Sequence, residues 1–466
     1  MLNLYNSSDK NSILEYAKKL KDKSLLEACG ETIHTETYSG KGKFGQLLEK
    51  HYFGYTPNSI AEPDFSKAAM ELKSSPLKQL KNKEYRSKER IVLNIINYLE
   101  VIDQDFDNSS FWSKNAHLLL VFYLHDRDKH AIEYLIKLVD DWTFPPEDLE
   151  VIKKDWEAIN QKIKSGKAHE LSEGDTFYLG ACTKGGKGGN PRKQPNNNLL
   201  AKQRAYSLKQ GYVNHIIASI SGQENQTYGK LLPSKEVAKK KTIEEIVLSK
   251  FQPNYGKTVD EIIQSLPIIL NMKAKGFYAN LTKAILDIEL DKKIEEFEKA
   301  DITIKAVRLK ENNLPKEDIS FPAFKYMELI NEEWDTSNFK NLLEHKFLFV
   351  FFQLHGNQLV LRKVKFWNMP FQDIEDAKKV WKKTIEVING GSIVREIKIV
   401  KNGRKSRLTN FPNKNFSSVS HVRPHARDAD DTYPLPVRDK LTMLDAYTKH
   451  CFWLNANYIR DEVYLK

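Results

Sequence analysis

Apolar residues recur at helical spacing in three parts of the chain. Residues 12–28 and 44–52 fit amphipathic helices, and the second follows a Gly-Lys-Gly turn. Residues 145–164 have proline at the start, acids in the first turn and glycine after the end. These are the usual signals of helix termini, so a helix is predicted there.

Strand patterns lie between these helices. Residues 68–75 fit a short strand, and residues 118–124 form a continuous apolar run that is typical of a central strand. Residues 91–101 are also apolar, but the pattern allows either a helix or a strand. The chain is therefore expected to mix both kinds of element.

The pattern repeats once along the chain. Each half has an apolar strand ending in histidine, then Trp-x-x-Pro, then a tryptophan 11 residues after the proline: Trp142, Pro145 and Trp156, and again Trp367, Pro370 and Trp381. Residues 206–212 are likewise echoed by residues 452–458. With seven tryptophans in all, duplication of one fold is the natural inference, although packing alone can also fix such residues.

A chain of 466 residues is too long for one ordinary core, which favours two domains. The polar stretch 221–241 is typical of a linker. We therefore expect domains over residues 1–220 and 242–466.

The composition narrows the class of protein. A net charge of +11 fits a polyanionic partner, although a solvated basic surface would give the same total. Three widely spaced cysteines argue against a zinc ribbon and a disulfide scaffold. The sequence shows no signal peptide and no run of 18 apolar residues, so we expect a soluble protein of a reducing cytoplasm with no membrane partner.

One segment carries basic residues but no acidic ones. Residues 176–223 contain no Asp or Glu, while Lys184, Lys187, Arg192 and Lys209 are among their basic residues. A surface that faces phosphates needs this bias because a carboxylate would repel them. A disordered basic loop without specificity is the competing interpretation.

The strongest candidate for chemistry is Asp64, Glu71 and Lys73. Strand residues two apart share a face, so Glu71 and Lys73 project together, and Pro63 favours an extended entry for Asp64. Two carboxylates suit Mg²⁺, and the lysine would stabilise an attacking hydroxide in phosphodiester hydrolysis. About one such spacing is expected by chance in this composition, so context must decide.

That context resembles the MutH and Sau-three-A restriction endonuclease family. The resemblance rests on Gly-Gln-Leu-Leu-Glu at 45–49, Pro-Asp at 63–64, Glu-Leu-Lys at 71–73, and residues 87–98 and 166–174. It implies an α/β (α+β) fold of two tandem PD-(D/E)xK domains, each with a mixed central sheet flanked by helices. It also implies Mg²⁺-dependent hydrolysis of double-stranded DNA at GATC, with cleavage before the G.

The resemblance assigns further residues in the first half. Glu49 would assist the metal ligands Asp64 and Glu71, and Lys114 would be a second active-site lysine. Lys184 would donate to guanine, and Tyr206 and Lys209 would lie beside the target adenine and the phosphates. Composition alone favours an ordinary solvated helix residue for Glu49, and Lys114 could also be a plain surface lysine. Cys182 replaces a basic residue of MutH, and residues 188–198 are inserted.

The second half is expected to be degenerate. Aligning residues 303–305 with 71–73 keeps a lysine but puts Thr303 in place of the glutamate, unless the alignment is shifted by a few residues. Arg423 and His425 are expected to contact DNA. Zinc binding by His421 and His425 is the alternative, but Pro424 disfavours the helix that it needs. In the family this half is a non-catalytic effector domain.

Together these features predict a type II restriction endonuclease of the bacterial cytoplasm, with a catalytic domain at 1–220 and a regulatory DNA-binding domain at 242–466. We expect a monomer in solution that pairs on two DNA sites. The alternatives are a nicking endonuclease of mismatch repair and a non-catalytic DNA-binding regulator.

Overall fold

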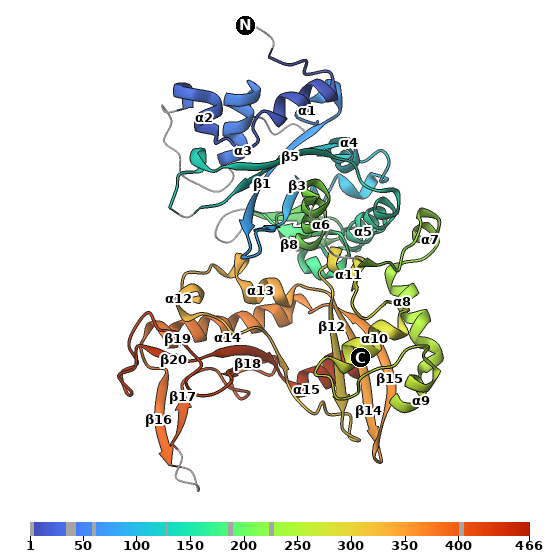
Figure 1. The fold of residues 1–466 in the computed structure, drawn as a ribbon, viewed down its shortest axis with the longest axis vertical. Coiled ribbons are helices and arrows are strands. Elements are labelled where there is room, and N and C mark those ends of the chain that lie inside the picture. Colours follow the sequence, from blue (N-terminus) through green and yellow to red (C-terminus); the bar gives the residue numbers. More distant parts are fainter. Residues whose placement is uncertain are drawn as a thin grey trace. The chain divides into compact units, whose positions relative to one another are not determined.

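The computed structural model describes residues 4–33, 43–57, 62–126, 128–184, 190–222, 228–399 and 405–466. They form two compact units (Figure 1). Unit 1 comprises Met1–Ile246 and Ile288–Ile302, and unit 2 comprises Val247–Asp287 and Thr303–Lys466. The expected linker at 221–241 thus lies in unit 1, which also includes a segment from within the expected second domain.

In its described residues, unit 1 contains two larger sheets and their covering helices. One sheet has the order β2-β1-β4-β5 and the other β3-β9-β6, with a separate hairpin β7-β8 and a short parallel pair β10-β11. The strands are β1 (Glu71–Gln79), β2 (Tyr85–Ser87), β3 (Ile91–Ile95), β4 (Leu118–Leu124), β5 (Ile136–Trp142), β6 (Leu179–Thr183), β7 (Pro191–Gln194), β8 (Asn197–Lys202), β9 (Arg204–Leu208), β10 (Tyr228–Gly229) and β11 (Lys293–Ile294). The helices are α1 (Lys10–Lys18), α2 (Leu25–Cys29), α3 (Lys43–Leu47), α4 (Ser110–Asn115), α5 (Pro146–Lys164), α6 (Gln210–Ser221), α7 (Lys235–Lys240) and α11 (Glu295–Lys299), while α8 (Ile243–Phe251) crosses the boundary between the units.

Most of the elements predicted in this half are confirmed, one is corrected, and one that was left open is decided. The helix expected over residues 12–28 is two helices, because Asp22 has a positive φ of 62° and Ser24 forms a capping box that starts α2. Residues 91–101 form the strand β3 followed by a short 3₁₀ turn. The apolar face of β1 and β4 packs against α1 and α3 through a core that includes Ile13, Leu47 and Leu119.

Unit 2 has a related set of sheets, in the orders β12-β14-β15 and β13-β21-β18, with hairpins β16-β17 and β19-β20. Its strands are β12 (Thr303–Leu309), β13 (Ile319–Ser320), β14 (Phe347–His355), β15 (Gln358–Trp367), β16 (Val394–Ile399), β17 (Lys405–Thr409), β18 (Ser420–Pro424), β19 (Thr432–Pro434), β20 (Ala446–Thr448) and β21 (His450–Leu454). Its helices are α9 (Val259–Ser265), α10 (Phe277–Ile285), α12 (Tyr326–Leu329), α13 (Asn338–Leu343), α14 (Phe371–Asn389) and α15 (Ala456–Tyr458).

The strand register supports the expected repeat. β1 and β12 are both parallel to the next strand, which is antiparallel to a third: Glu71 pairs with Leu118 and Leu118 with Trp142, as Thr303 pairs with Phe347 and Phe347 with Trp367. Thr303 therefore stands at the position of Glu71, and Lys305 at that of Lys73. The alignment made from the sequence is confirmed.

A hydrogen bond between a tyrosine and an aspartate is also duplicated. The Tyr212 hydroxyl donates to Asp148 at the start of α5 over 3.0 Å, and the Tyr458 hydroxyl donates to Asp373 at the start of α14 over 2.7 Å. The two aromatic residues belong to the segments that the sequence matched. The helix α6 is thus tied to α5 in unit 1 in the same way as α15 is tied to α14 in unit 2.

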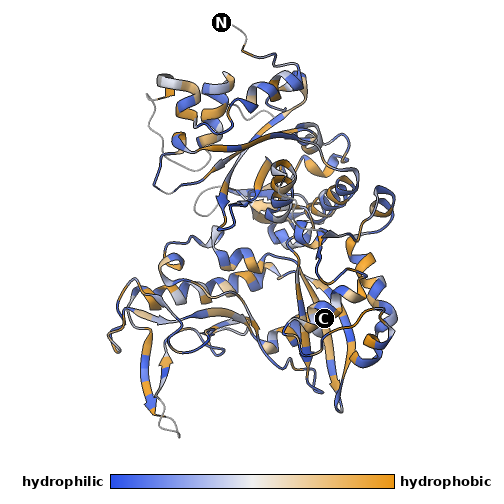
Figure 2. Cartoon of the chain, viewed as in Figure 1, coloured by the Kyte–Doolittle hydropathy of each residue, from blue (hydrophilic) through white to orange (hydrophobic). Residues whose placement is uncertain are grey.

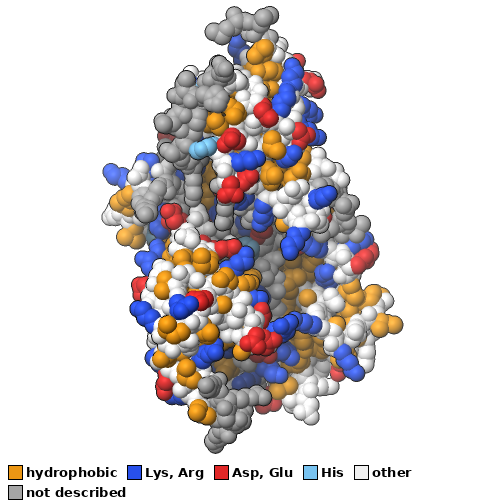
Figure 3. All heavy atoms as spheres, turned by 60° about the vertical axis from the view of Figure 1, so that its left-hand side comes forward, with side chains coloured by type: hydrophobic (Ala, Val, Ile, Leu, Met, Phe, Trp, Pro, Cys, Tyr) orange, Lys and Arg blue, Asp and Glu red, His pale blue; other side chains and the backbone are white. Residues whose placement is uncertain are grey.

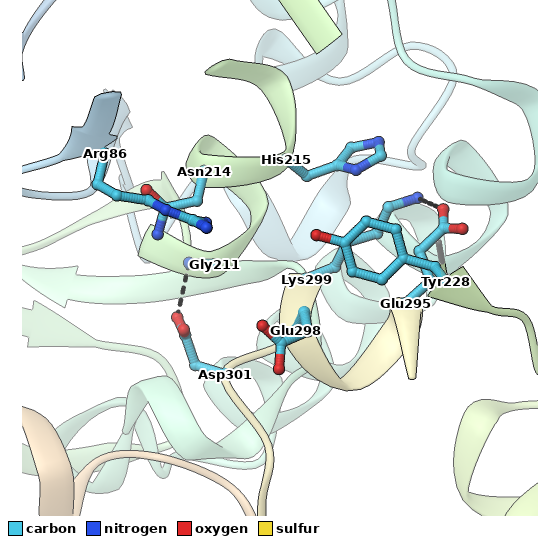
Figure 4. A pocket seen from close by; sticks show the side chains of 9 residues that line it. All are labelled: Arg86, Gly211, Asn214, His215, Tyr228, Glu295, Glu298, Lys299 and Asp301. Carbon is cyan, nitrogen blue, oxygen red and sulfur yellow. Dashed lines mark hydrogen bonds and ion pairs between the residues drawn. The ribbon is translucent and has the colours of Figure 1, made fainter. Parts of the chain in front are cut away.

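The segment Ile288–Ile302 is held in unit 1 by polar contacts (Figure 4). Lys299 forms ion pairs with Asp148 and Glu295, both at 2.8 Å, and only 4% of its side chain is exposed. The Asp301 carboxylate accepts a hydrogen bond from the amide of Gly211 over 2.9 Å.

None of the helices in the described residues is long and apolar enough to cross a membrane.

Candidate active site

A tight turn places Asp64 beside the start of β1. Phe65 and Met70 form a bridge across it, and Ala69 adopts a left-handed φ of 48°, which is uncommon for a residue with a side chain. The amide of Asp64 donates to Glu71 Oε2 over 3.0 Å. The amide of Leu72 donates to Asp64 Oδ2, also over 3.0 Å. These reciprocal bonds fix the two carboxylates next to each other.

Two lysines converge on Glu71. Lys73 Nζ lies 2.6 Å from Glu71 Oε1, and Lys114 Nζ, from the last turn of α4, lies 3.6 Å from the same oxygen. Glu71 is only 2% exposed, so it needs this compensation for its buried charge. The structure therefore brings Lys114 to the site and does not leave it as an unrelated surface lysine.

Glu49 approaches from the helical segment that continues α3. A Cβ added to Gly45 would lie 3.2 Å from Ser74 Oγ on β1 and 4.0 Å from Glu49 Oε1, so glycine permits this close approach. Burial, and then the charges of Asp64 and Glu71, raise the pKa of Glu49 to about 7. Glu49 thus belongs electrostatically to the site.

The site has excess negative charge. Burial and the neighbouring Glu71 raise the pKa of Asp64 to about 6. The buried Tyr55 hydroxyl, which has no hydrogen-bond partner among the described residues, has a pKa raised by burial and then by Asp64 and Glu49. Tyr55 carries no motif that sequence reasoning could have used.

Such a cluster has the chemistry of a site for a hard divalent cation, because carboxylate oxygens are suitable ligands and a cation would relieve their repulsion. Asp64 and Glu71 are the best-placed ligands. In the described part of the chain no three His, Cys, Asp or Glu side chains form a ready metal cluster, so Glu49 does not complete a set of three in this structure.

The raised pKa values predict how metal binding depends on pH. The protonated carboxyl groups of Glu49 and Asp64 are favoured in the folded state. Without metal, ionisation of these two groups therefore makes the protein less stable as pH rises through about 6 to 7. Metal ligands must be deprotonated, so Mg²⁺ should raise the melting temperature more at about pH 8 than at about pH 5.5. Differential scanning fluorimetry measures this. The variant Asp64→Asn/Glu49→Gln should lose most of the difference, and an equal shift at both pH values would contradict the prediction.

Of the residues predicted to bind DNA in unit 1, two are exposed and two are buried. Lys184 and Arg192 are exposed, and Arg192 donates to Gln203 over 3.0 Å. Tyr206 and Lys209 are 1% and 4% exposed, and the Lys209 ammonium donates to the carbonyl of Thr176. Neither buried side chain can reach a phosphate without leaving the interior. Lys187 lies outside the described residues.

In unit 2, Arg423 and His425 lie beside one aromatic ring. The Arg423 guanidinium lies 3.7 Å from the centre of the Trp453 ring and 3.0 Å from Asp318, and His425 is exposed and meets the same ring edge-on. His421 is buried and bonded to Asn455 over 2.6 Å. Residues 421–431 thus show no zinc cluster, and the described part of the chain holds none elsewhere.

The net charge does not by itself locate a DNA surface. Figure 3 shows basic and acidic side chains interspersed over the visible face. The register does show that Cys182 of β6 corresponds to Arg423 of β18, because they pair with Ala205 and Cys451. A basic residue thus occupies in the second unit the strand position that a cysteine occupies in the first.

The comparisons with known proteins agree with this geometry. The family model described as DNA mismatch repair enzyme MutH matches residues 53–155, which include Asp64, Glu71, Lys73 and Lys114. MutH proteins of Vibrio campbellii and Shewanella woodyi are 28% and 25% identical to this chain, over 33% and 42% of it and 67% and 85% of their own lengths. The fold and site thus define a MutH-like nuclease.

A similarity over nearly the whole chain shows the family. The type II restriction enzyme Sau3AI of Staphylococcus aureus is 36% identical to this chain over 97% of the chain and 98% of its own length. The chain belongs to the family of this restriction enzyme.

Proposed function

We propose that this protein is a Mg²⁺-dependent type II restriction endonuclease of the bacterial cytoplasm that cleaves double-stranded DNA at GATC, before the G. The single observation that carries the proposal is the convergence of Asp64, Glu71, Lys73 and Lys114 at the start of β1. The similarity to Sau3AI over nearly the whole chain supports the restriction class. The GATC site rests on family resemblance.

The residues of unit 1 supply the groups that hydrolysis needs. Asp64 and Glu71 would hold the cation, with Glu49 assisting nearby. Bound there, the cation would acidify water and neutralise charge on the scissile phosphate. Lys73 Nζ would donate to the attacking oxygen and stabilise its negative charge, while Lys114 would offset charge on the phosphate oxygens. Attack on phosphorus breaks the bond to the leaving oxygen, which takes up a proton.

Unit 2 would bind DNA without cutting it. Thr303 has no carboxylate to offer a cation, and burial lowers the pKa of Lys305. Alignment of the serine caps of α4 and α13 also puts Leu342 at the position of Lys114. We assign regulation to this unit, with Arg423 and His425 toward DNA, in a monomer that pairs on two DNA sites.

Two other functions make different predictions. A nicking endonuclease of mismatch repair needs one copy of the fold, so a second unit counts against it. A non-catalytic regulator would have no use for the buried ion pair of Lys73 and Glu71. Neither alternative has a specific observation in its favour.

Digestion of plasmid DNA with Mg²⁺ tests the proposal. We expect linear fragments whose sequenced ends all fall before the G of GATC. Adenine-methylated DNA is digested in parallel, and its cleavage or protection shows whether methylation blocks cutting. Nicked circles would indicate the mismatch-repair activity. A shifted but uncut plasmid would indicate the regulator, and fragment ends at another sequence would overturn the assigned site.

A further inference from the structure

Unit 2 has a two-stranded ribbon with no counterpart in unit 1. It consists of β16 and β17 and extends as a narrow arm from its unit (Figure 1). It is inserted between α14 and β18. In unit 1, the corresponding residues 165–178 between α5 and β6 contain only turns and short 3₁₀ helices. The duplicated fold therefore does not require the ribbon.

The base of the ribbon is fixed. The amide of Val394 donates to the Asp439 carboxylate over 2.8 Å, and Asp439 is fully buried and also accepts from Thr442. Arg407 lies 5.9 Å from the ring centre of the buried Tyr447. The end of the ribbon next to unit 2 is thus held by contacts with buried residues.

Beyond this base, the ribbon is exposed and combines apolar with basic residues. Ile399 is 77% exposed and Ile397 43%. Ile397 pairs with Arg407 and Ile399 with Lys405, and paired residues of antiparallel strands share a face. Figure 2 shows the alternation of apolar and polar residues along β16. This face carries no acidic residue.

An exposed apolar ribbon is unfavourable unless it has a partner. Two isolated strands are marginally stable in water, and bare apolar strand edges favour aggregation. In the described strands four basic residues accompany the single acid Glu396. That charge favours a polyanion, and the major groove of DNA is wide enough for a two-stranded ribbon, where apolar side chains can contact thymine methyl groups.

We propose that the ribbon β16–β17 is a DNA contact surface of unit 2, with the Ile397 and Ile399 face toward the major groove and Arg395 and Lys398 toward the phosphates. The proposal rests on the proposed function in that DNA is the partner. It adds the element that makes contact and its mode of binding.

The test compares full-length variants in duplex binding, by fluorescence anisotropy in EDTA at several salt concentrations. Arg395→Ala/Lys398→Ala should reduce the slope of log affinity against log salt by about two, since each phosphate contact contributes about 0.9. Ile399→Ser should weaken binding with little change in slope. Lys379→Ala/Lys382→Ala removes the same charge from exposed positions of α14 and should leave the slope unchanged.

An unchanged slope in Arg395→Ala/Lys398→Ala, or an equal change in the α14 control, would overturn the proposal. So would ribbon variants that alter sedimentation but not DNA binding, because that outcome assigns the surface to a protein partner. Circular dichroism checks that each variant is folded. Because binding is measured without metal, a chain that binds through the ribbon but never cuts would refute only the proposed function.

Discussion

Purified Lys73→Ala protein should cleave DNA about 10²–10³-fold more slowly than the parent, at saturating Mg²⁺ and DNA. Lys73 Nζ is the cation closest to the carboxylate oxygens, 2.6 Å from Glu71 Oε1. Removing it leaves no donor of equal proximity for the attacking oxygen. Glu71 keeps Lys114 at 3.6 Å and the Asp64 amide at 3.0 Å, so the local fold should survive. Single-turnover cleavage measures the chemical step directly.

The repeat supplies a matched control. Lys305 has the same strand register in unit 2 as Lys73 in unit 1, so Lys305→Ala makes the same change in a site without the carboxylate. Its single-turnover rate should stay within about threefold of the parent. Duplex affinity in EDTA should change little in Lys73→Ala. Cleavage at the parental rate by Lys73→Ala would refute the role of this lysine, and equal losses in both variants would refute the division of labour between the units.

The catalytic centre was largely predictable from sequence because its chemistry is local. Asp64, Glu71 and Lys73 lie within ten residues, and the two-residue period of a strand fixes the relative direction of the last two. The repeat was also predictable, since tryptophans and prolines at fixed spacing stand out against a small background. The register then showed that Thr303 replaces Glu71.

What sequence could not supply depends on burial and long-range packing. Lys209 lies in a segment free of acids and was expected on the surface, yet it folds inward to a backbone carbonyl, because tertiary contacts decide where a long side chain ends. Tyr55 reaches the site with no motif of its own. Nor did any pattern show that Ile288–Ile302 belongs to unit 1.

That segment gives the second large prediction. Lys299→Met should lower the unfolding free energy of unit 1 by about 3–5 kcal/mol, because it leaves two buried carboxylates without their cation. The Lys299 ammonium lies 2.8 and 2.9 Å from the two oxygens of Asp148 and 2.8 Å from Glu295. Asp148 is 2% exposed. Urea denaturation followed by tryptophan fluorescence measures the loss.

A control lies in the same segment. Lys293 pairs with Glu298 at 2.7 Å, but both side chains are more than 40% exposed, so Lys293→Met should cost less than about 1 kcal/mol. Adding Asp148→Asn to Lys299→Met should recover part of the loss, because it removes one buried charge. In unit 2 the equivalent Asp373 accepts a hydrogen bond from the Tyr458 hydroxyl over 2.7 Å. A Lys299→Met protein as stable as Lys293→Met would show that the segment is not needed to hold unit 1 together. The expected result would mean that unit 1 needs the segment Ile288–Ile302 for its stability, although this segment comes directly before β12 of unit 2 in the chain.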